Sequence, residues 1–185
     1  MNSPQYSLFP ETVYEYFILI SPTDEIKVYV DLLKQQLHGL IGLDATNLNS
    51  LAHITLFKYE GTDSMMIPEV VKRAIRYQPS FSIKIFGAGK NVQNGTGNVY
   101  LKIANPAPIN ELVKRLKPKF KKAPAKIKPH ISLAKNVAQA DIEKIPDITL
   151  FDYFADFLCD RVTILRRPLG STGWFSPVAE VKLEG

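Results

Sequence analysis

The chain has 185 residues, 45% of them apolar and 22% charged, a composition that suits a globular domain with its own hydrophobic core. Its single cysteine, Cys159, excludes an internal disulfide and agrees with a reducing cytoplasm, where we expect the protein to act with this thiol buried. The longest apolar run near the N-terminus, residues 17–20, is too short for a membrane span and follows no basic leader. We therefore expect no membrane contact.

The net charge of +5 is concentrated in one basic stretch, residues 114–128. This stretch has eight basic residues and no acidic one, so the remainder of the chain carries a charge of −3. One interpretation is a solvated helix face and loop, and the other is a positive rim that attracts a phosphate ester. The basic residues are Lys114, Arg115, Lys117, Lys119, Lys121, Lys122, Lys126 and Lys128.

The first half of the chain predicts strands and helices in alternation. Residues 13–20 form a β-branched and aromatic run that is typical of a buried strand. Apolar side chains then recur at helical spacing from Ile26 to Ile41, after a capping sequence at residues 21–24 and before a stop at Gly42. The later elements of this half are a strand at about 51–58, a helix over 68–77, a strand over 81–86, and glycine turns at 87–89 and 94–97.

The second half of the chain repeats this order. Its expected elements are a strand over 99–104, a helix over 109–116, a strand over 128–133, a short helix over 138–145, and strands over 148–157, 161–166 and 175–183. The repetition indicates an internal duplication. We expect one domain over 1–185 made of two pseudo-symmetric lobes, about 11–90 and 91–185.

Both halves contain the hexapeptide His-Ile-(Thr or Ser)-Leu-x-Lys, and its two copies start 77 residues apart. The copies hold two of the three histidines of the chain. Side chains alternate along a strand, so each histidine shares a face with the hydroxyl two residues later, whereas Ile and Leu point into the core. His53 with Thr55, and His130 with Ser132, would then face each other across a cleft between the lobes.

These four side chains suit chemistry at a phosphodiester. An unperturbed imidazole has a pKa of about 6.5, so one histidine can remove a proton from a nucleophile while the other protonates a leaving oxygen. The hydroxyls can hydrogen-bond phosphate oxygens. We expect His53 and His130 to be catalytic and Thr55 and Ser132 to bind the substrate phosphate. Which histidine is the acid and which the base stays open.

Other interpretations of these and neighbouring residues exist. A lone strand histidine beside a hydroxyl is more often structural, and it is the pairing that favours catalysis. We expect His38 to be a surface residue on the polar side of the first helix, together with Lys34. Lys58 and Lys135 end the two hexapeptides; in a regular strand they face away from the histidines, and they reach phosphate only where the strand ends or bulges. Three aromatic residues of the first strand could stack a base or pack in the core: Tyr14, Tyr16 and Phe17.

The paired sequences resemble the His-x-(Thr or Ser)-apolar motifs of the 2H phosphoesterase superfamily, which includes the 2′-5′ RNA ligase and RNA 2′,3′-cyclic phosphodiesterase group. Both motifs, their separation and the duplicated layout agree with that family. The resemblance implies a bilobal α+β fold in which two antiparallel sheets flank a central cleft, with helices on the outer faces. It also implies a metal-independent phosphodiesterase acting on 2′,3′-cyclic phosphate or 2′-5′ linked nucleotide or RNA substrates.

The sequence has no zinc-binding spacing, no Walker-type loop and no dinucleotide fingerprint, so we expect no metal, no cofactor and no ATP-driven ligation. The expected partner is an RNA or nucleotide substrate with a phosphodiester, bound by a monomer. The alternative function is a non-catalytic module that binds RNA or a nucleotide in the same cleft.

Overall fold

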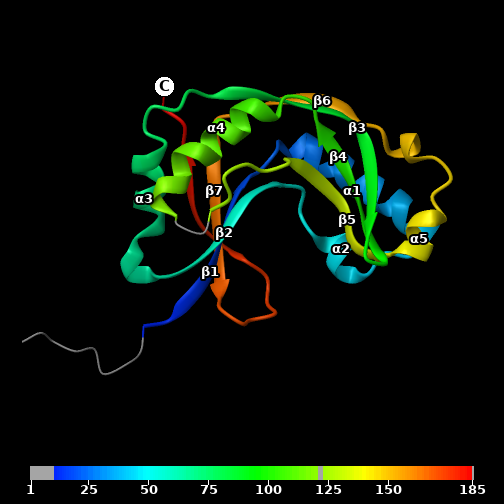
Figure 1. The fold of residues 1–185 in the computed structure, drawn as a ribbon, viewed down its shortest axis with the longest axis horizontal. Helices are drawn as coiled ribbons and strands as arrows, with labels where there is room; N and C mark the ends of the chain where they lie inside the picture. Colours follow the sequence, from blue (N-terminus) through cyan, green and yellow to red (C-terminus); the bar gives the residue numbers. More distant parts are fainter. Residues whose placement is uncertain (1–10, 121–122, 185) are drawn as a thin grey trace, which may run out of the picture.

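In the computed structural model, which describes residues 11–120 and 123–184, the strands form one curled antiparallel sheet (Figure 1). Its order is β6-β3-β4-β5-β2-β1-β7-β8. The strands are β1 (Val13–Ile20), β2 (Ile54–Thr62), β3 (Phe81–Gln93), β4 (Thr96–Ile103), β5 (His130–Ala138), β6 (Phe154–Cys159), β7 (Arg161–Pro168) and β8 (Ser176–Lys182).

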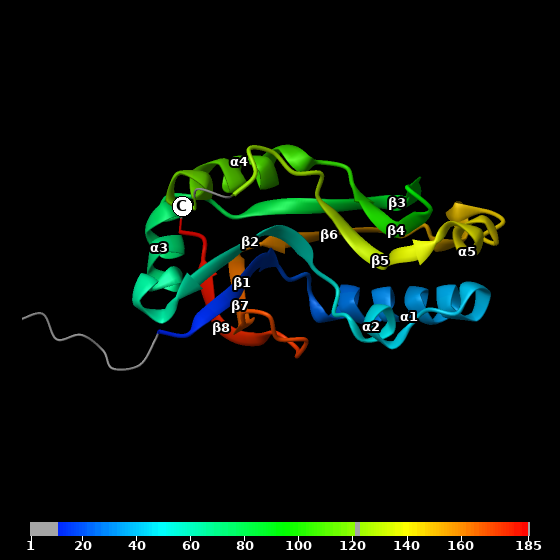
Figure 2. The same cartoon turned by 60° about the horizontal axis from the view of Figure 1, so that its bottom comes forward.

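The helices gather at the two ends of the molecule in both views (Figures 1 and 2). Three of them, α1, α2 and α5, lie beside the β3, β4 and β5 end, and α3 packs against β8 and α4 at the other end. None of the helices in the described residues is long and apolar enough to cross a membrane. The helices are α1 (Asp24–Ile41), α2 (Ala45–Asn49), α3 (Ile67–Ala74), α4 (Pro106–Leu116) and α5 (Gln139–Glu143), with 3₁₀ turns at Asp63–Met65, Lys117–Lys119 and Ile148–Phe151.

The sheet consists of two four-stranded halves that meet between β2 and β5. The pairing between these two strands has a single register position, Ile54 opposite Ile131, and each isoleucine directly follows a motif histidine. The predicted α+β class is confirmed, whereas the prediction of two separate sheets is wrong. The two sheets become one because the inner edges of the halves pair with each other at Ile54 and Ile131.

Consecutive chain segments do not build the two halves. The half around β2 also holds β1, β7 and β8, and the half around β5 holds β3, β4 and β6. The chain therefore crosses from one half to the other after β2 and returns for β7. The two lobes predicted at about 11–90 and 91–185 follow the repeated order of elements in the sequence. This division of the chain stays a prediction.

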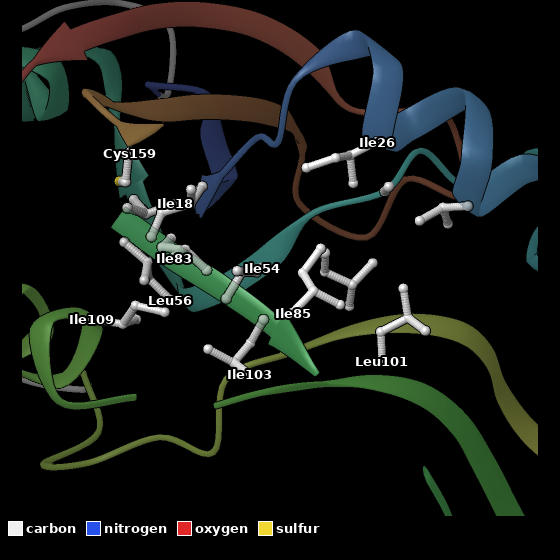
Figure 3. Close-up of a cluster of buried hydrophobic side chains, with 14 of the residues drawn as sticks. Ile18, Ile26, Ile54, Leu56, Ile83, Ile85, Leu101, Ile103, Ile109 and Cys159 are labelled. Carbon is white, nitrogen blue, oxygen red and sulfur yellow. The ribbon is translucent and has the colours of Figure 1, made fainter. Parts of the chain in front are cut away.

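The core is continuous across the two halves (Figure 3). Ile18 and Ile54 from one half, and Ile83 and Leu101 from the other, are fully buried in the same cluster. Cys159 lies in this core and is 2% exposed, which confirms the predicted burial. Burial raises the pKa of its thiol to about 12, so the thiol stays protonated and unreactive at neutral pH.

Most predicted elements are confirmed, including α1 with its end at Gly42. That glycine adopts a left-handed conformation, with φ of 69°, and its N–H donates to the carbonyl of His38 over 2.8 Å. The expected turn at 87–89 is wrong, because β3 continues through it to Gln93. The strand bulges there instead: Gly87 has a φ of 72°, and the N–H of Ala88 donates to Asp152 over 2.6 Å.

The observed elements differ from the predicted ones in two further short segments. The strand expected over 148–157 begins as a 3₁₀ turn, Ile148–Phe151, and only β6 extends from Phe154. The helix α2 has no counterpart among the predicted elements, because five residues are too few for a periodic apolar pattern. This helix matters for the site, since it lies against β5.

Candidate active site

The two motif histidines lie where β2 and β5 begin, at the junction of the sheet halves, and the same local hydrogen bond holds each ring. The Nδ1 atom of His53 lies 2.7 Å from the carbonyl oxygen of Leu51, and that of His130 lies 2.8 Å from the carbonyl oxygen of Lys128. A carbonyl only accepts hydrogen bonds, so Nδ1 carries the hydrogen in both neutral rings. Each Nε2 is then free to accept a proton.

An aromatic side chain on the next strand outward contacts each imidazole. Phe17 of β1 meets His53 edge to face, with ring centroids 5.0 Å apart, and Tyr100 of β4 lies 5.4 Å from His130. Phe17 also contacts Phe175, at 5.3 Å. The two histidines therefore occupy equivalent positions in the two halves, and neither ring lies inside a separate core.

Three neighbouring pockets surround the histidines. The first is lined by His53 of one motif together with Ser132 and Lys135 of the other, so the structure brings residues of both motifs into one pocket. His53 also lines a second, mostly apolar pocket with Phe17, Trp174 and Phe175. The third pocket is lined by His130, Tyr100, Lys102, Lys128, Asn91 and Asn98.

Thr55 does not line any of these three pockets. It is half-buried on β2, and its register partner on β1 is Leu19. The structure therefore places His53 and Ser132 in one pocket and brings His130 near enough for its charge to act on His53, whereas Thr55 is not part of the lining of that pocket.

The pKa of His53 is lowered from 6.5 to about 4, and burial is the main cause. Its hydrogen bond to Leu51 acts in the opposite direction, and the positive charges of Lys135, Lys34 and His130 add to the lowering. His53 is consequently neutral at pH 7. With Nδ1 protonated, its Nε2 can act as a base.

Lys34 corrects a sequence expectation. The helical pattern predicts Lys34 on the solvated side of α1, yet its side chain is buried, with 1% exposed. Its ammonium donates to the carbonyl and, over 2.8 Å, to the hydroxyl of Ser50, which directly follows the unpredicted helix α2. Burial lowers the pKa of Lys34, and Asp31 opposes this effect. His38 is exposed, as expected.

Matching bulges interrupt the two motifs at their leucines. On β2, Thr55 pairs with Leu19 while Phe57 pairs with Ile18, so Leu56 is an additional residue without its own partner. The bulge reverses the alternation of side chains, and Lys58, opposite Phe17, comes to the face of Thr55.

The second motif has a corresponding irregularity at its leucine, and a further register shift follows at Lys135 and Asn136. On β5, Ser132 pairs with Tyr100 and Ala134 pairs with Val99, which leaves Leu133 as the additional residue. Lys135 therefore comes to the face of Ser132, in agreement with its place in the pocket beside His53. In a regular strand the two terminal lysines would face away from the histidines; the bulges bring both to the histidine side.

The two lysines have different neighbours. Lys58 donates to Glu15 over 2.8 Å, and its ammonium lies 5.4 Å from the ring centroid of Phe17 and 5.2 Å from that of Phe175. Arg167 binds the same carboxylate over 2.7 Å. Burial would raise the pKa of Glu15, but the hydrogen bonds from these two cations hold it below its ordinary value.

Lys135 has no ion pair within the part of the chain that the structure describes. The pKa of its ammonium is lowered, first by burial and then by the charge of Lys58. Its backbone bonds to the Asn47 side chain of α2: the N–H of Lys135 donates to Oδ1 over 2.8 Å, and Nδ2 donates to the Lys135 carbonyl over 3.1 Å. No local sequence signal predicts this contact between residues 47 and 135.

The basic stretch lies mainly outside the site. Lys128 lines the pocket of His130, and Lys102 joins it from β4. Lys114 lies 3.8 Å from Glu111 on α4 and, with Lys126, lines a different pocket. Lys121 and Lys122 lie outside the described residues. Lys128 is therefore the described member of the stretch that lies at the site, and its role as a positive rim stays a prediction; most of the other described members are exposed residues of α4 and its loop.

Solved structures share this architecture at low sequence identity. E. coli LigT complexed with phosphate has a TM-score of 0.69 and 16% identity, over 94% of this chain and 99% of that one. LigT complexed with ATP has a TM-score of 0.67 and 17% identity, over 94% and 99%. A structure described as a phosphoesterase has a TM-score of 0.67 and 17% identity, over 95% and 100%.

A match to a family model identifies the family of the chain, whereas the solved structures show only its fold. The family model described as the 2′-5′ RNA ligase superfamily matches residues 24–170, a region that contains both motifs. The chain therefore belongs to the 2′-5′ RNA ligase superfamily, the 2H phosphoesterases that the paired motifs indicated. The comparison with curated proteins found no match.

Proposed function

We propose that the protein is a metal-independent phosphodiesterase that acts on 2′,3′-cyclic phosphate or 2′-5′ linked nucleotide or RNA substrates by two-histidine acid–base catalysis. The observation that carries this proposal is the pocket that His53 shares with Ser132 of the other motif, within electrostatic range of His130. LigT, which has the same fold, has been crystallised with phosphate and with ATP.

The surroundings of the two rings suggest their roles in hydrolysis. His53 is held neutral, so its Nε2 takes the proton from water as the oxygen attacks phosphorus. His130 then gives a proton to the ribose oxygen as its bond to phosphorus breaks. Water is thus added across one P–O bond, and the imidazolium of His53 afterwards returns its proton to solvent while His130 takes one up. Ser132 and Thr55 would donate to the non-bridging oxygens.

The apolar pocket on the other side of His53 suits a nucleobase. Phe17, Trp174 and Phe175 line it, and an aromatic surface stacks any base. The polar pocket of His130, with Lys102 and Lys128, suits a further phosphate. Both features favour a nucleotide or an RNA end over a small phosphodiester without a base.

The test is hydrolysis of nucleoside 2′,3′-cyclic phosphates with EDTA present. His53→Ala and His130→Ala should each lower kcat/KM at least about 10²-fold, because each removes a general acid or base. His38→Ala is the matched control, since this exposed histidine of α1 should leave kcat/KM unchanged.

Two results would contradict the proposal. Activity that survives both motif substitutions would disprove the two-histidine mechanism, and activity lost in EDTA would disprove metal independence. Binding of RNA without turnover of cyclic or 2′-5′ linked substrates would instead identify the non-catalytic binding module.

A further inference from the structure

A charged network lies behind the apolar pocket of His53. The carboxylate of Glu15 on β1 accepts from Lys58 over 2.8 Å and from Nε of Arg167 over 2.8 Å. Arg167 lies directly opposite Glu15 on β7, and Lys58 belongs to β2, so one carboxylate joins three adjacent strands. These three residues are not among the lining of the pocket. They therefore act on a ligand in the pocket through the side chains that do line it.

The two cations of this network lie against Phe175, an aromatic side chain that lines the pocket. The guanidinium of Arg167 is 4.4 Å from the centroid of the Phe175 ring, and the ammonium of Lys58 is 5.2 Å from it. Lys58 also contacts the ring of Phe17 at 5.4 Å, and the two rings are 5.3 Å apart. The negative face of an aromatic ring attracts a cation, so two cations and a second ring hold Phe175 in place.

The chain segment before Phe175 has no regular structure of its own. Residues 171–175, between β7 and β8, belong to neither a helix nor a strand. Arg167 donates to the carbonyl of Gly173 over 3.2 Å, in addition to its contact with the Phe175 ring. One guanidinium thus holds both the backbone of this segment and its aromatic ring. Glu15 fixes the guanidinium in turn, through Nε and also through Nη2 over 2.7 Å.

We propose that Glu15 is a positioning residue for the base of the substrate. It holds Arg167 and Lys58 against Phe175, and this keeps the ring in place as a surface on which the base stacks. Glu15 itself does not contact the substrate. This inference rests on the proposed function and deepens it, because it assigns the shape of the base pocket to a charged network outside the pocket.

Binding of adenosine 3′-monophosphate is the first test, since it does not depend on turnover. Trp174 is the single tryptophan of the chain and lines the same pocket, so its fluorescence reports binding. Stacking on an aromatic side chain changes the affinity for a base roughly five- to a hundredfold. Glu15→Ala should therefore raise the dissociation constant of this nucleotide at least about fivefold.

A double-mutant cycle tests whether Glu15 acts through Phe175. Phe175→Ala should weaken nucleotide binding at least as much as Glu15→Ala does. Adding Glu15→Ala to Phe175→Ala should then change the dissociation constant by less than about twofold, whereas a merely structural role would give additive effects. Glu180→Ala is the matched control, because this carboxylate pairs with Arg161 of β7 over 2.9 Å and lines a different pocket; binding should stay within about twofold of the wild type.

Turnover of a nucleoside 2′,3′-cyclic phosphate is the second test. Glu15→Ala should raise KM at least about fivefold and keep kcat within about threefold, because the base contact is shared by the ground state and the transition state. Circular dichroism checks that the variant is folded. If Glu15→Ala unfolds, Glu15→Gln takes its place, since it keeps the size of the side chain without its charge, and it should raise KM and the dissociation constant in the same direction.

The results separate this inference from the function itself. If His53→Ala and His130→Ala abolish turnover while Glu15→Ala keeps the wild-type KM and nucleotide affinity, the function holds and the role of Glu15 is refuted. If the wild type hydrolyses none of the substrates, the function fails, and the nucleotide titration alone decides the role of Glu15. Additive effects of Glu15→Ala and Phe175→Ala, or no binding of the nucleotide to the wild type, overturn the assignment.

Discussion

Equivalent hydrogen bonds hold the two motif histidines, but their surroundings differ. His53 lies between an apolar pocket lined by Phe17 and Trp174 and a pocket that contains the cation Lys135. Both conditions disfavour an imidazolium, one through lost hydration and the other through charge repulsion. This setting keeps the ring of His53 neutral at pH 7 and well below it, which is the protonation state that the proposed base needs.

The pH dependence of His53 follows from its lowered pKa of about 4. Since the ring is neutral above that value, we expect its NMR resonances to stay constant from pH 8 to about pH 5 and to titrate only below. The unfolded chain takes up a proton near pH 6.5, before the folded one does. The contribution of His53 to stability is therefore complete above about pH 6.5 and is lost as the pH falls toward about 4.

Lys135→Ala should move the titration of His53 to higher pH, because it removes a positive charge that lowers this pKa. Lys114→Ala, which removes a lysine of α4 that lines a different pocket, is the control and should leave the titration of His53 unchanged. A His53 ring that titrates near pH 6.5 in the wild type would show that the site does not hold it neutral.

At the scale of elements, the bulges at Leu56 and Leu133 decide which motif residues face the site. Alternation along a strand correctly predicts that Ile54 and Ile131 are buried, and both are 0% exposed. It fails after the leucines, because a bulge depends on the register with the neighbouring strand, β1 or β4, and that register is not encoded in the hexapeptide itself. The terminal lysines were consequently the least predictable residues of the motif.

The two hydrogen bonds between the Asn47 side chain of α2 and the Lys135 backbone of β5 form a clamp between these elements, which the hexapeptide does not encode either. The contribution of this clamp to stability can be measured. Asn47→Ala removes two hydrogen bonds to the backbone of Lys135, so we expect the free energy of unfolding to fall by about 1–2 kcal/mol. Asn49→Ala, an exposed asparagine at the end of the same helix, should change it by less than about 0.5 kcal/mol. Chemical denaturation measures both values, and equal effects of the two substitutions would contradict the clamp.

At the scale of the whole molecule, the sequence analysis leads to two separate sheets, whereas the chain builds one curled sheet with two four-stranded halves. The difference arises from contacts far apart in sequence: β7 returns to pair with β1, and β2 meets β5 at one register position. Periodicity identifies strands, but it does not report which strands become neighbours. The fold class could be predicted for this reason, whereas the single sheet could not.

Substitutions at the junction of the two sheet halves should lower the stability of the protein. Ile54 and Ile131 are fully buried, and they join the halves directly beside the two histidines. Ile54→Ala or Ile131→Ala should each lower the free energy of unfolding by about 2–4 kcal/mol, the usual cost of a cavity in a packed core. Val13→Ala is the control, because Val13 is 41% exposed and its loss should cost less than about 0.5 kcal/mol.

Because one core crosses the junction, the variants should still unfold in a single transition. Tryptophan fluorescence follows Trp174 near the His53 pocket, and far-ultraviolet circular dichroism follows the entire sheet. The two signals should give the same midpoint in wild type and variants. Midpoints that separate in Ile54→Ala or Ile131→Ala would show that the halves unfold independently, and the spacing of His53 and His130 would then depend on this one contact between β2 and β5.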